Sequence, residues 1–591
     1  MARKRLEKVA TYPERLEAIN EIKSYEDINQ SNGYSEIGET IKEFLNHLSV
    51  PIVIGLDGYL MNNWDLINNK LSRYIGSKNV EINYIDIGDY MKDDKEMNSL
   101  FEKYLTDDPV FGKIYKGELD SFFDNAKIQN LKQFLINNEN EIIVVYGTGT
   151  GIDELIDLYD LLIYFDLTRE EMLKRQKTLG SDFKTQSIGP KRSYYIDFPV
   201  NDKHRKQVLK HANFYVDAND KNYPVMVKNE DFKHSLEKLT KQPFRLKPIY
   251  EPGPWGGQWL RKVRKLPEKW ENCAWSYEVI APEMSLLLSN PENSVVLEIP
   301  WKTFTALFYT QIVGDVAPER FCGEFPVRFD YLDTYEGGDL SIQVHPTSEY
   351  IKENFNECYH QGEMYYIVAS KKGRKVNLGL NEGIKISDFR EAAEKAEKEH
   401  IPFDYKTFVN GIEVNKHDIV MIPPGTVHGS REGLVVLEIS ATTYRYTFKI
   451  YDHLRPDLSG AMRPIHIEHA FNVINSDRTT KWVKNNLKIE PTLLRKEKGV
   501  KEYLIADREE FFHKVHRIEF DTKYSDYTNG SFQVLTLVEG EKISLKVSNM
   551  HNKSIELNYS ETVIVPAAVE KYEVLNKGDN PCKVVKALLK E

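Results

Sequence analysis

The chain has 591 residues and a mass of 68.7 kDa, which at about 150 residues per domain predicts three or four domains. Hydrophobic residues make up 41% and charged residues 29%, so the chain can bury a core and is neither disordered nor of low complexity. The formal net charge of -11 argues against nucleic acid or an anionic membrane as a general partner.

The cysteines and the apolar runs indicate a cellular compartment. Cys273, Cys322, Cys358 and Cys582 lie far apart without a CxxC pair, so we expect reduced thiols and no disulfide framework. The charged N-terminal residues are not followed by an apolar segment. The longest apolar runs, such as Ile142–Tyr146, are far shorter than the ~20 residues of a membrane helix. These features predict a cytoplasmic protein without a membrane span.

Residues 1–242 alternate between apolar runs and helical stretches. The runs Val50–Asp57, Ile142–Tyr146 and Leu161–Asp166 are predicted to be buried strands. Helices are expected at Asp124–Asn137 and Arg169–Thr178. Continuous apolar strands separated by helices predict an α/β domain with a parallel sheet.

The pattern changes where prolines and glycines crowd residues 243–257. From there onward short β-type runs dominate, with a helical insert expected at Ile386–Glu399. Frequent short strands with turn residues predict an all-β double barrel or jelly roll. We expect a first β domain at residues 243–490 and a second at residues 491–591. The runs are Ser294–Ile299, Leu340–Val344, Met364–Val368, Ile419–Ile422, Leu434–Ile439, Phe532–Gly540 and Thr562–Ala567.

A short pattern occurs twice in this β region. Ile419–Gly425 and Thr562–Ala567 both end an apolar run in Ile-Pro or Val-Pro. The repetition predicts two related barrels, the second of which lacks the polar residues of the first.

Polar residues in the first barrel suggest a metal site. Gln343 and His345 are two apart on a predicted strand, so they share a face. Glu363 precedes an apolar strand, and His428 follows a Pro-Gly turn. A barrel can bring such residues to one interior point, where two imidazoles, a carboxylate and an amide oxygen suit a divalent metal. The competing interpretation is that each histidine is structural, which is the commoner case for a single histidine on a strand.

A series of segments between about Pro252 and Asn475 makes a family recognisable. In order, they are Trp255–Gly257, Phe325–Asp333, Leu340–Pro346, Gly362–Tyr366, Asn410–Asn415, Ile422–His428, Leu437–Ile439, Thr443–Arg445 and Arg463–His466. This part of the chain resembles the type I phosphomannose isomerases, which are zinc-dependent mannose-6-phosphate isomerases of the cupin fold.

The resemblance implies a reaction and a set of ligands. The reaction is the interconversion of mannose 6-phosphate and fructose 6-phosphate, carbohydrate isomerisation through an enediol, with one zinc ion per chain. The zinc ligands would be Gln343, His345, Glu363 and His428. Ser341 would contact the substrate phosphate.

The resemblance also implies a cation near the reacting carbons. The arginine of the family's Tyr-Arg motif falls most naturally on Arg445, which we therefore expect to be catalytic. A competing register matches Ile450–Asp452 and places Lys449 there as a substrate-binding cation. The sequence does not identify the base that moves the proton.

Two positions depart from the family pattern. Gln361 and Asp330 stand where the family usually has lysines. These replacements keep open a regulatory alternative, in which the chain senses a sugar phosphate without turning it over. His360 could supply an acid/base group, although an exposed loop position is the expectation for it.

Residues 40–220 faintly resemble the uridine-kinase branch of the P-loop kinases. Ile52–Gly58 stands where the phosphate loop would begin, and Leu161–Arg169 is similar to a later strand and its turn. The residues after Gly58 include neither the lysine nor the hydroxyl that a phosphate loop needs. We therefore expect a catalytically degenerate domain that binds a nucleotide or acts as a scaffold. Gly147–Gly151 is expected to be an ordinary strand–helix turn.

Overall fold

The computed structural model describes residues 20–23, 28–76, 82–139, 141–179, 189–280, 282–289, 296–316, 318–441, 443, 445–547 and 554–590. These residues belong to two compact units. The first comprises mainly Glu21–Lys238 and Pro282–Leu307, and the second mainly Leu239–Ala281 and Phe308–Glu591. Pro282–Leu307 therefore groups with the α/β residues, although the division at residue 242 would place it in the β region. Within the described residues, no helix combines the length and apolar character that crossing a membrane requires.

The first unit is built on a seven-stranded sheet in the order β2-β8-β7-β6-β3-β5-β4. The five strands from β7 to β4 are parallel, which confirms the parallel sheet predicted from the apolar runs. Strands β8 and β2 continue the sheet in antiparallel pairing. The strands are β2 (Gln30–Asn32), β3 (Ile52–Gly58), β4 (Ile82–Asp86), β5 (Ile142–Tyr146), β6 (Leu161–Asp166), β7 (Phe214–Asp217) and β8 (Val225–Lys228).

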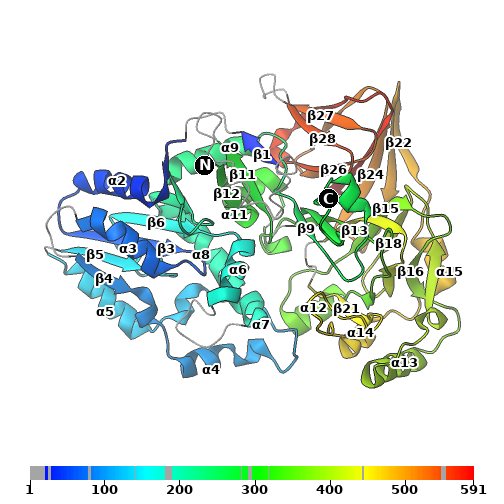
Figure 1. Ribbon diagram of the computed structural model, residues 1–591, viewed down its shortest axis with the longest axis horizontal. Helices are drawn as coiled ribbons and strands as arrows, with labels where there is room; N and C mark the ends of the chain where they lie inside the picture. The colour runs from blue at the N-terminus through cyan, green and yellow to red at the C-terminus, as the bar shows by residue number, and fades with distance from the viewer. Residues whose placement is uncertain are drawn as a thin grey trace. The chain divides into compact units, whose positions relative to one another are not determined.

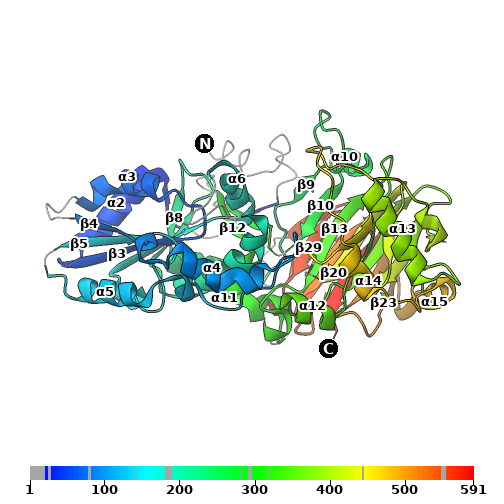
Figure 2. The ribbon, with the colours of Figure 1, turned by 90° about the horizontal axis from the view of Figure 1, so that it is seen from below.

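Helices cover both faces of this sheet, which is why β3 and β6 are buried throughout and apolar apart from Asp57 and Asp166 near their carboxyl ends. Helices α2 and α3 lie on one face and α5 on the other (Figures 1 and 2). The helices are α2 (Gly33–Asn46), α3 (Trp64–Ile75), α4 (Asp94–Leu105), α5 (Asn125–Ile136), α6 (Arg169–Leu179), α7 (Pro190–Arg192), α8 (Phe198–His211) and α9 (Asn229–Leu239).

A segment from the β region completes the first unit. Strands β11 (Ser285–Ser289) and β12 (Val296–Pro300) pair with each other, and β11 also pairs with β1 (Glu21–Lys23). Helix α11 (Trp301–Val313) follows, and its backbone leaves helical geometry at Phe308, where the second unit resumes.

The second unit contains two pairs of sheets. We call the first pair the first sandwich: its sheets have the orders β18-β15-β20-β13-β10-β9 and β17-β16-β19-β14-β21. Its strands are β9 (Ile249–Glu251), β10 (Trp275–Val279), β13 (Val327–Asp333), β14 (Ile342–Val344), β15 (Glu363–Ser370), β16 (Lys375–Leu380), β17 (Val409–Glu413), β18 (Ile419–Ile422), β19 (His428–Ser430), β20 (Leu434–Ala441) and β21 (Phe448–Tyr451).

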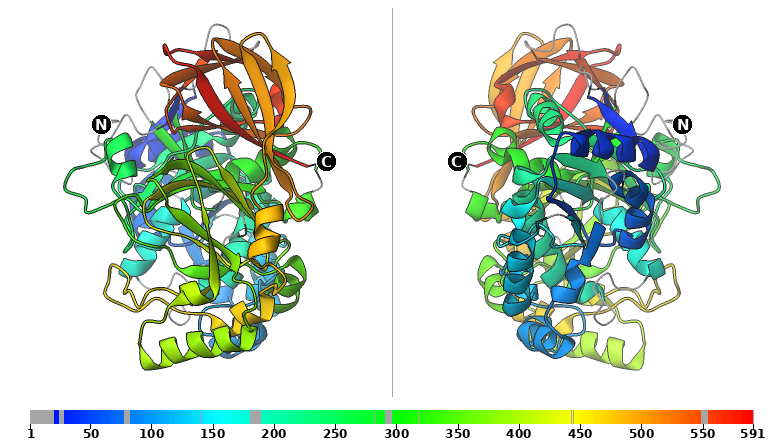
Figure 3. Two further views of the ribbon diagram at one scale, coloured as in Figure 1. Left: turned by 90° about the vertical axis from the view of Figure 1, so that its right-hand side faces the viewer. Right: turned by 90° about the vertical axis from the view of Figure 1, so that its left-hand side faces the viewer.

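The second sandwich has the sheet orders β29-β26-β31-β24-β23-β22 and β28-β27-β30-β25. Figure 3 shows its strands, in orange to red, as a group separate from the green to yellow strands of the first sandwich. Its strands are β22 (Thr492–Glu497), β23 (Val500–Ala506), β24 (His513–Phe520), β25 (Lys523–Tyr527), β26 (Gln533–Glu539), β27 (Lys542–Val547), β28 (Ser554–Asn558), β29 (Thr562–Val565), β30 (Lys571–Asn576) and β31 (Cys582–Leu589).

The two sandwiches repeat one topology. Read in chain order, the ten strands of the second take the same places as ten strands of the first, and β21 is an addition to the first. The repeat predicted from the sequence is therefore present in the fold. Strands β11 and β12 interrupt the first copy between β10 and β13, where the second copy has only a short connection between β23 and β24.

The second unit is not purely β, so the all-β expectation is wrong. The helical insert is confirmed as α13 (Ile386–Glu399), but other helices accompany it. These are α10 (Trp259–Val263), α12 (Ser348–Phe355), α14 (Ile467–Val473) and α15 (Thr480–Asn486).

One pair of cysteines corrects the expectation of four reduced thiols. Cys322 and Cys358, 36 positions apart in the sequence, form a disulfide in which their Cα atoms are 6.3 Å apart. Cys273 and Cys582 are free and buried. The pairing was not readable from the sequence because only the fold brings the end of α12 beside the loop before β13. It weakens the sequence argument for a cytoplasmic location, which stays a prediction.

Candidate metal centre

The four predicted ligand residues come from both sheets of the first sandwich. Gln343 lies in the middle of β14, and His345 follows directly after that strand. His428 begins β19, which pairs with β14 so that Gln343 is opposite His428. Glu363 begins β15 in the facing sheet. The packing of the two sheets thus brings together residues that lie up to 85 positions apart.

The carboxylate lies between the two imidazoles. His345 Nε2 is 2.7 Å from Glu363 Oε2, and His428 Nε2 is 3.5 Å from Glu363 Oε1. Donor atoms of these three residues all lie within 4.8 Å of one another, and each residue is at most 2% exposed. Among the described residues this is the one group with such a geometry.

Backbone carbonyls fix the direction of both imidazoles. His345 Nδ1 lies 3.3 Å from the carbonyl oxygen of Tyr446, and His428 Nδ1 lies 2.9 Å from that of Thr426. A ring whose Nδ1–H donates to a carbonyl leaves its Nε2 lone pair for a metal. Both Nε2 atoms are the ones that face Glu363.

The ionisation state of Glu363 also favours binding of a cation. Burial opposes its ionisation, but His345 and His428 outweigh that effect and lower the pKa of Glu363 to about 2. Its Oε1 atom is buried and receives no well-formed hydrogen bond from the described residues. Burial lowers the pKa of His428 to about 4, against the attraction of Glu363, so this imidazole is neutral at pH 7. An anionic carboxylate beside a neutral imidazole is a combination of donors that zinc and similar ions prefer.

Gln343 and Ser341 lie at the edge of this group. The Gln343 amide places Nε2 3.2 Å from His428 Nε2, and Ser341 Oγ donates to Gln343 Oε1 at 2.9 Å. Rotating the amide by half a turn would exchange its nitrogen and oxygen and present Oε1 to the same point.

Behind Glu363 lies a buried network that contains both positions where the family usually has lysine. The Gln361 amide donates to Glu363 Oε2 at 3.0 Å and to Glu438 Oε1 at 3.4 Å. Arg328 lies 3.3 Å from Glu438 Oε1 and 3.0 Å from Asp330 Oδ2. Burial raises the pKa of Asp330 to about 6 despite Arg328, and it raises the pKa of Glu438 well above its ordinary value. Arg328 therefore supplies a positive charge in this network.

A second group of charges surrounds Asp452 just after β21. Arg463 Nη1 is 3.0 Å and Arg455 Nη2 is 3.1 Å from its carboxylate oxygens, and Lys449 Nζ is 3.9 Å away. Lys449 is opposite Gln343 in the β14–β21 register, so the two side chains share a face. Burial and the neighbouring Arg463 lower the pKa of Lys449 to about 8. Three cations here face one carboxylate.

The remaining predicted residues have different positions. Arg445 lies in the turn before β21, next to Tyr446, and interacts electrostatically with Glu357. Tyr444 of its motif lies outside the described residues. His360 was expected in an exposed loop, but it is only 9% exposed, since Ser348 Oγ and the carbonyl oxygen of Glu510 bind its two nitrogens.

Sequence reasoning missed Arg328, Glu438 and Arg455. Arg328 and Glu438 belong to segments that had been matched to the family, and both alternate with apolar residues on their strands. A charged residue in an otherwise apolar strand was the available signal. Their partners become visible only when β13 and β20 pair, with Asp330 opposite Glu438.

In the first unit, the glycine-rich turn Gly147–Gly151 after β5 binds a side chain from the segment that resembles the start of a phosphate loop. Asp57, at the end of β3, accepts hydrogen bonds from the backbone nitrogens of Gly149 at 3.1 Å and Gly151 at 2.6 Å. His204 Nε2 lies 2.7 Å from the same carboxylate. The glycine-rich turn after β5 is therefore more than an ordinary connection, because its amide groups hold Asp57. Nucleotide binding by this unit stays a prediction.

Comparison with known proteins gives different results for the two parts of the chain. A family described as a domain of unknown function (DUF8485) matches residues 33–241. The probable mannose-6-phosphate isomerase GmuF of Bacillus subtilis is 30% identical over 237 residues, which are 39% of this chain and 68% of that protein. The mannose-6-phosphate isomerase ManA of the same organism is 27% identical over 240 residues, or 40% of this chain and 69% of that protein.

Solved structures include a mannose 6-phosphate isomerase from Bacillus subtilis at 20% identity and a TM-score of 0.46, which covers 58% of this chain and 99% of that one. The relationship rests on the sequence comparison, in which the similarity to GmuF extends over 68% of that protein at 30% identity. On this ground the chain belongs to the mannose-6-phosphate isomerase family.

Proposed function

We propose that this protein interconverts mannose 6-phosphate and fructose 6-phosphate at the metal centre of the first sandwich. The observation that carries the proposal is the meeting of His345, Glu363 and His428 at one buried point, with both Nε2 atoms directed at the carboxylate. Membership of the isomerase family supports the choice of reaction.

Gln343, His345, Glu363 and His428 would hold one zinc ion. When bound, the metal would stabilise the negative charge that develops on the sugar oxygens during isomerisation. The protein prepares for this role by burying the ligands and by fixing both imidazoles through backbone carbonyls.

The substrate phosphate would bind near Asp452, where Lys449, Arg455 and Arg463 converge. A local excess of cations would offset the repulsion between the net charge of -11 and a phosphorylated sugar. Lys449 also shares a face with Gln343, so it would reach the sugar beside the metal ligands. Ser341, which donates to Gln343 and directly precedes β14, would contact the substrate from that position.

Arg445 is the alternative cation for charge stabilisation. Arg445 interacts electrostatically with Glu357, whereas Lys449 lies opposite one of the proposed ligands in the strand register. Replacing each residue by methionine separates the two assignments. The variant that loses turnover while keeping its metal identifies the cation that acts on the substrate.

A coupled assay for fructose 6-phosphate on the zinc-loaded full chain tests the proposal. We expect turnover in the parent, and loss of both metal content and turnover in His345→Ala. His400→Asn is the matched control, because His400 is exposed at the end of α13 and should keep both properties. Turnover that survives in metal-free protein would contradict the proposal. Tight binding of mannose 6-phosphate without turnover would instead support the sensor interpretation raised by Gln361 and Asp330.

A further inference from the structure

The carboxyl ends of β3 and β6 lie side by side in the first unit, at a place with no role in the proposed isomerisation. From β3 the chain proceeds to β4 on one side of the sheet, and from β6 it proceeds to β7 on the other. Adjacent strands whose connections diverge in this way mark the point where open α/β sheets bind ligands. The side chains at this point are therefore candidates for a binding site.

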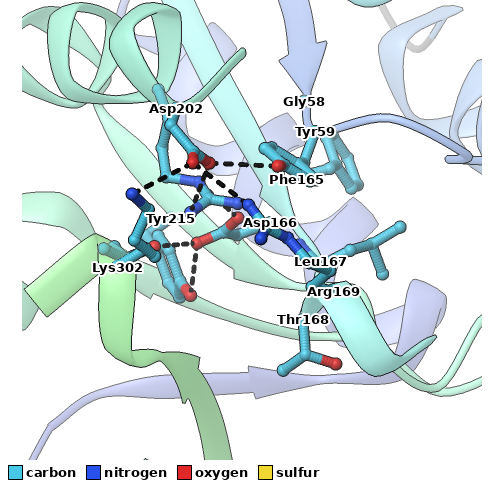
Figure 4. Close-up of polar contacts among 12 residues, drawn as sticks. Gly58, Tyr59, Phe165, Asp166, Leu167, Thr168, Arg169, Asp202, Tyr215 and Lys302 are labelled. Atoms are coloured by element: carbon cyan, nitrogen blue, oxygen red, sulfur yellow. Dashed lines mark hydrogen bonds and ion pairs between the residues drawn. The ribbon is translucent and has the colours of Figure 1, made fainter. Parts of the chain in front are cut away.

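Cations converge there on a single carboxylate. Asp202 of α8 has Arg169 Nη2 and Lys302 Nζ each 3.3 Å from Oδ2, and Arg205 Nη1 lies 3.7 Å from Oδ1. The Tyr59 hydroxyl donates to Oδ1 at 3.0 Å. Figure 4 shows Tyr59, Arg169 and Lys302 directed at Asp202 from beyond the ends of β3 and β6 and from α11, and Arg205 lies on α8 with Asp202. Four donors around one anion resemble the surroundings of a bound phosphate group.

The two arginines are held in place independently of Asp202. Arg205 stacks over the Tyr59 ring at 3.9 Å, and Arg169 stacks over the Phe198 ring at 4.1 Å. Cation–π contacts of this kind fix the guanidinium planes. Both guanidinium groups would therefore keep their arrangement if Asp202 moved aside.

Two further carboxylates bind the outer sides of the arginines. Asp166 Oδ1 lies 3.1 Å from Arg205 Nε, and Glu283 Oε1 lies 3.7 Å from Arg169 Nη1. Asp166 is itself fixed by the Thr303 hydroxyl at 2.7 Å and the Tyr215 hydroxyl at 3.2 Å. These partners leave Nη1 of Arg205, Nη2 of Arg169 and the Lys302 ammonium directed at Asp202.

Asp202 is more exposed than the two arginines. Its side chain is 17% exposed, whereas those of Arg169 and Arg205 are 8% and 3% exposed. Lys302, at 14% exposed, resembles Asp202. Burial opposes ionisation of Asp202, but Lys302, Arg169 and Arg205 outweigh it and lower its pKa. An ionised side chain at the solvent edge of a buried cation cluster is the member that can be exchanged for an external anion.

We infer that Arg169, Arg205, Lys302 and Tyr59 form a binding site for a phosphate monoester group, which Asp202 occupies in this conformation. The site suits a monoester better than a polyphosphate, because the glycine amides after β5 that could hold a second phosphate are bound to Asp57. Lys302 comes from the segment inserted between β10 and β13, so the site depends on the two regions of sequence being joined in one chain.

Titration calorimetry of full-length Asp202→Asn with inorganic phosphate tests the inference. We expect saturable binding at least about tenfold tighter than in the parent, since the competing internal anion is gone while its cationic partners remain. Adding Lys302→Met to this variant should weaken the binding again. Asp197→Asn is the matched control, because Asp197 is a buried aspartate of the same region that faces one arginine, Arg192. Its phosphate binding should equal that of the parent.

Thermal unfolding gives a second measurement if Asp202→Asn is destabilised. Phosphate should then raise the unfolding temperature of Asp202→Asn more than that of Asp197→Asn, because a ligand stabilises the fold that binds it. A folded Asp202→Asn protein without saturable phosphate binding would overturn the inference, and so would binding that Lys302→Met leaves unchanged.

Three ligands distinguish the sources of the phosphate group. Mannose 6-phosphate, adenosine monophosphate and inorganic phosphate share the anion but differ in what it is attached to. Measuring all three in a His345→Ala background removes the contribution of the metal centre to sugar-phosphate binding. An ester that binds more tightly than inorganic phosphate supports a monoester site and identifies its class. Tighter binding of inorganic phosphate than of either ester would contradict the assignment of a monoester site.

Discussion

The two sandwiches of the second unit share a topology but contain different polar centres. Glu363 and Gln533 are equivalent, since each begins its strand and pairs with the residue before a proline, Ile422 in the first sandwich and Val565 in the second. The same position thus carries a carboxylate in one copy and an amide in the other. The fold accepts both because the position lies at the end of a strand, inside the sandwich.

In the second sandwich, a lysine of the chain itself pairs with two carboxylates. Lys586 Nζ lies 2.9 Å from Glu502 Oε1 and 2.6 Å from Asp526 Oδ2, and His516 Nδ1 lies 2.8 Å from Glu502 Oε1. Lys586 is only 4% exposed. This sandwich was expected to lack polar residues of the kind found in the first, but it contains a different set in which the charges are paired.

The difference between the copies lies in where the positive charge comes from. In the first sandwich, Glu363 and two imidazoles offer lone pairs to one point. Among the described contacts of Glu363, no ammonium or guanidinium group forms an ion pair with it. In the second, the ammonium of Lys586 occupies the space between two carboxylates. A buried carboxylate needs a compensating cation, which the second copy supplies from its own strand and the first can take from solution.

The largest predicted effect comes from making the first sandwich resemble the second. Glu363→Gln introduces the residue type of Gln533 and removes the anionic ligand. Because loss of a residue that only supports a ligand costs about 10–100-fold in metal affinity, loss of the ligand itself should cost at least that much and abolish turnover. Metal content and the isomerase assay measure it. The reciprocal change Gln533→Glu should add no metal, since the hydrogen-bond partners described for Gln533 are the Tyr527 carbonyl and the Tyr572 hydroxyl and not imidazoles.

The next prediction concerns removal of the buried cation of the second sandwich, the Lys586 ammonium. Lys586→Met leaves Glu502 and Asp526 buried without their shared partner and should lower the free energy of unfolding by about 3–5 kcal/mol in urea titrations. Adding Glu502→Gln should recover part of that loss. Lys583→Met is the control on the same strand, because Lys583 is 25% exposed and should change stability little. Equal effects of the two lysine changes would contradict the ion-pair account.

A smaller effect on metal affinity is expected from changing the buried network behind Glu363. Arg328→Met leaves Asp330 and Glu438 without their cation, so the Gln361 amide that bridges Glu438 and Glu363 should lose its position. We expect metal affinity to fall about 10–100-fold, as for other residues that support a ligand, with partial recovery in Arg328→Lys. Arg374→Met, at an exposed ion pair of the same sandwich, should leave metal affinity unchanged.

The smallest predicted effect concerns the stability of the fold at acidic pH. Burial opposes ionisation of Glu502, but His516 and Lys586 lower its pKa to about 2. An unfolded glutamate has a pKa of about 4.3, so the folded state binds fewer protons between these values. This contribution to stability should be fully present above about pH 4.3 and should fall as the pH drops toward 2. The stability of Glu502→Gln should depend less steeply on pH in this range, whereas Glu497→Gln, at an exposed position, should follow the parent.

Particular residues show how far the sequence could predict the site. The four proposed ligands were found because a family pattern fixes their order, and the structure brings three of them within a few ångströms. Arg328 and Glu438 were missed because their meaning depends on the pairing of β13 with β20. His360 was expected to be exposed because no local sequence pattern indicates that the carbonyl oxygen of Glu510, in the second sandwich, binds it.

The apolar runs alone determined the parallel sheet of the first unit, the helix Ile386–Glu399 and the repeat of two β regions, since burial periodicity and turn residues are local properties of the chain. Tertiary structure decided what depends on distant residues meeting. It joined Cys322 to Cys358, placed Pro282–Leu307 in the first unit, and directed the ammonium of Lys586 and the carboxylate of Asp202 into sites of opposite charge. Coulomb interactions and sheet packing act across space, so the partners of a buried charge cannot be read from its neighbours in sequence.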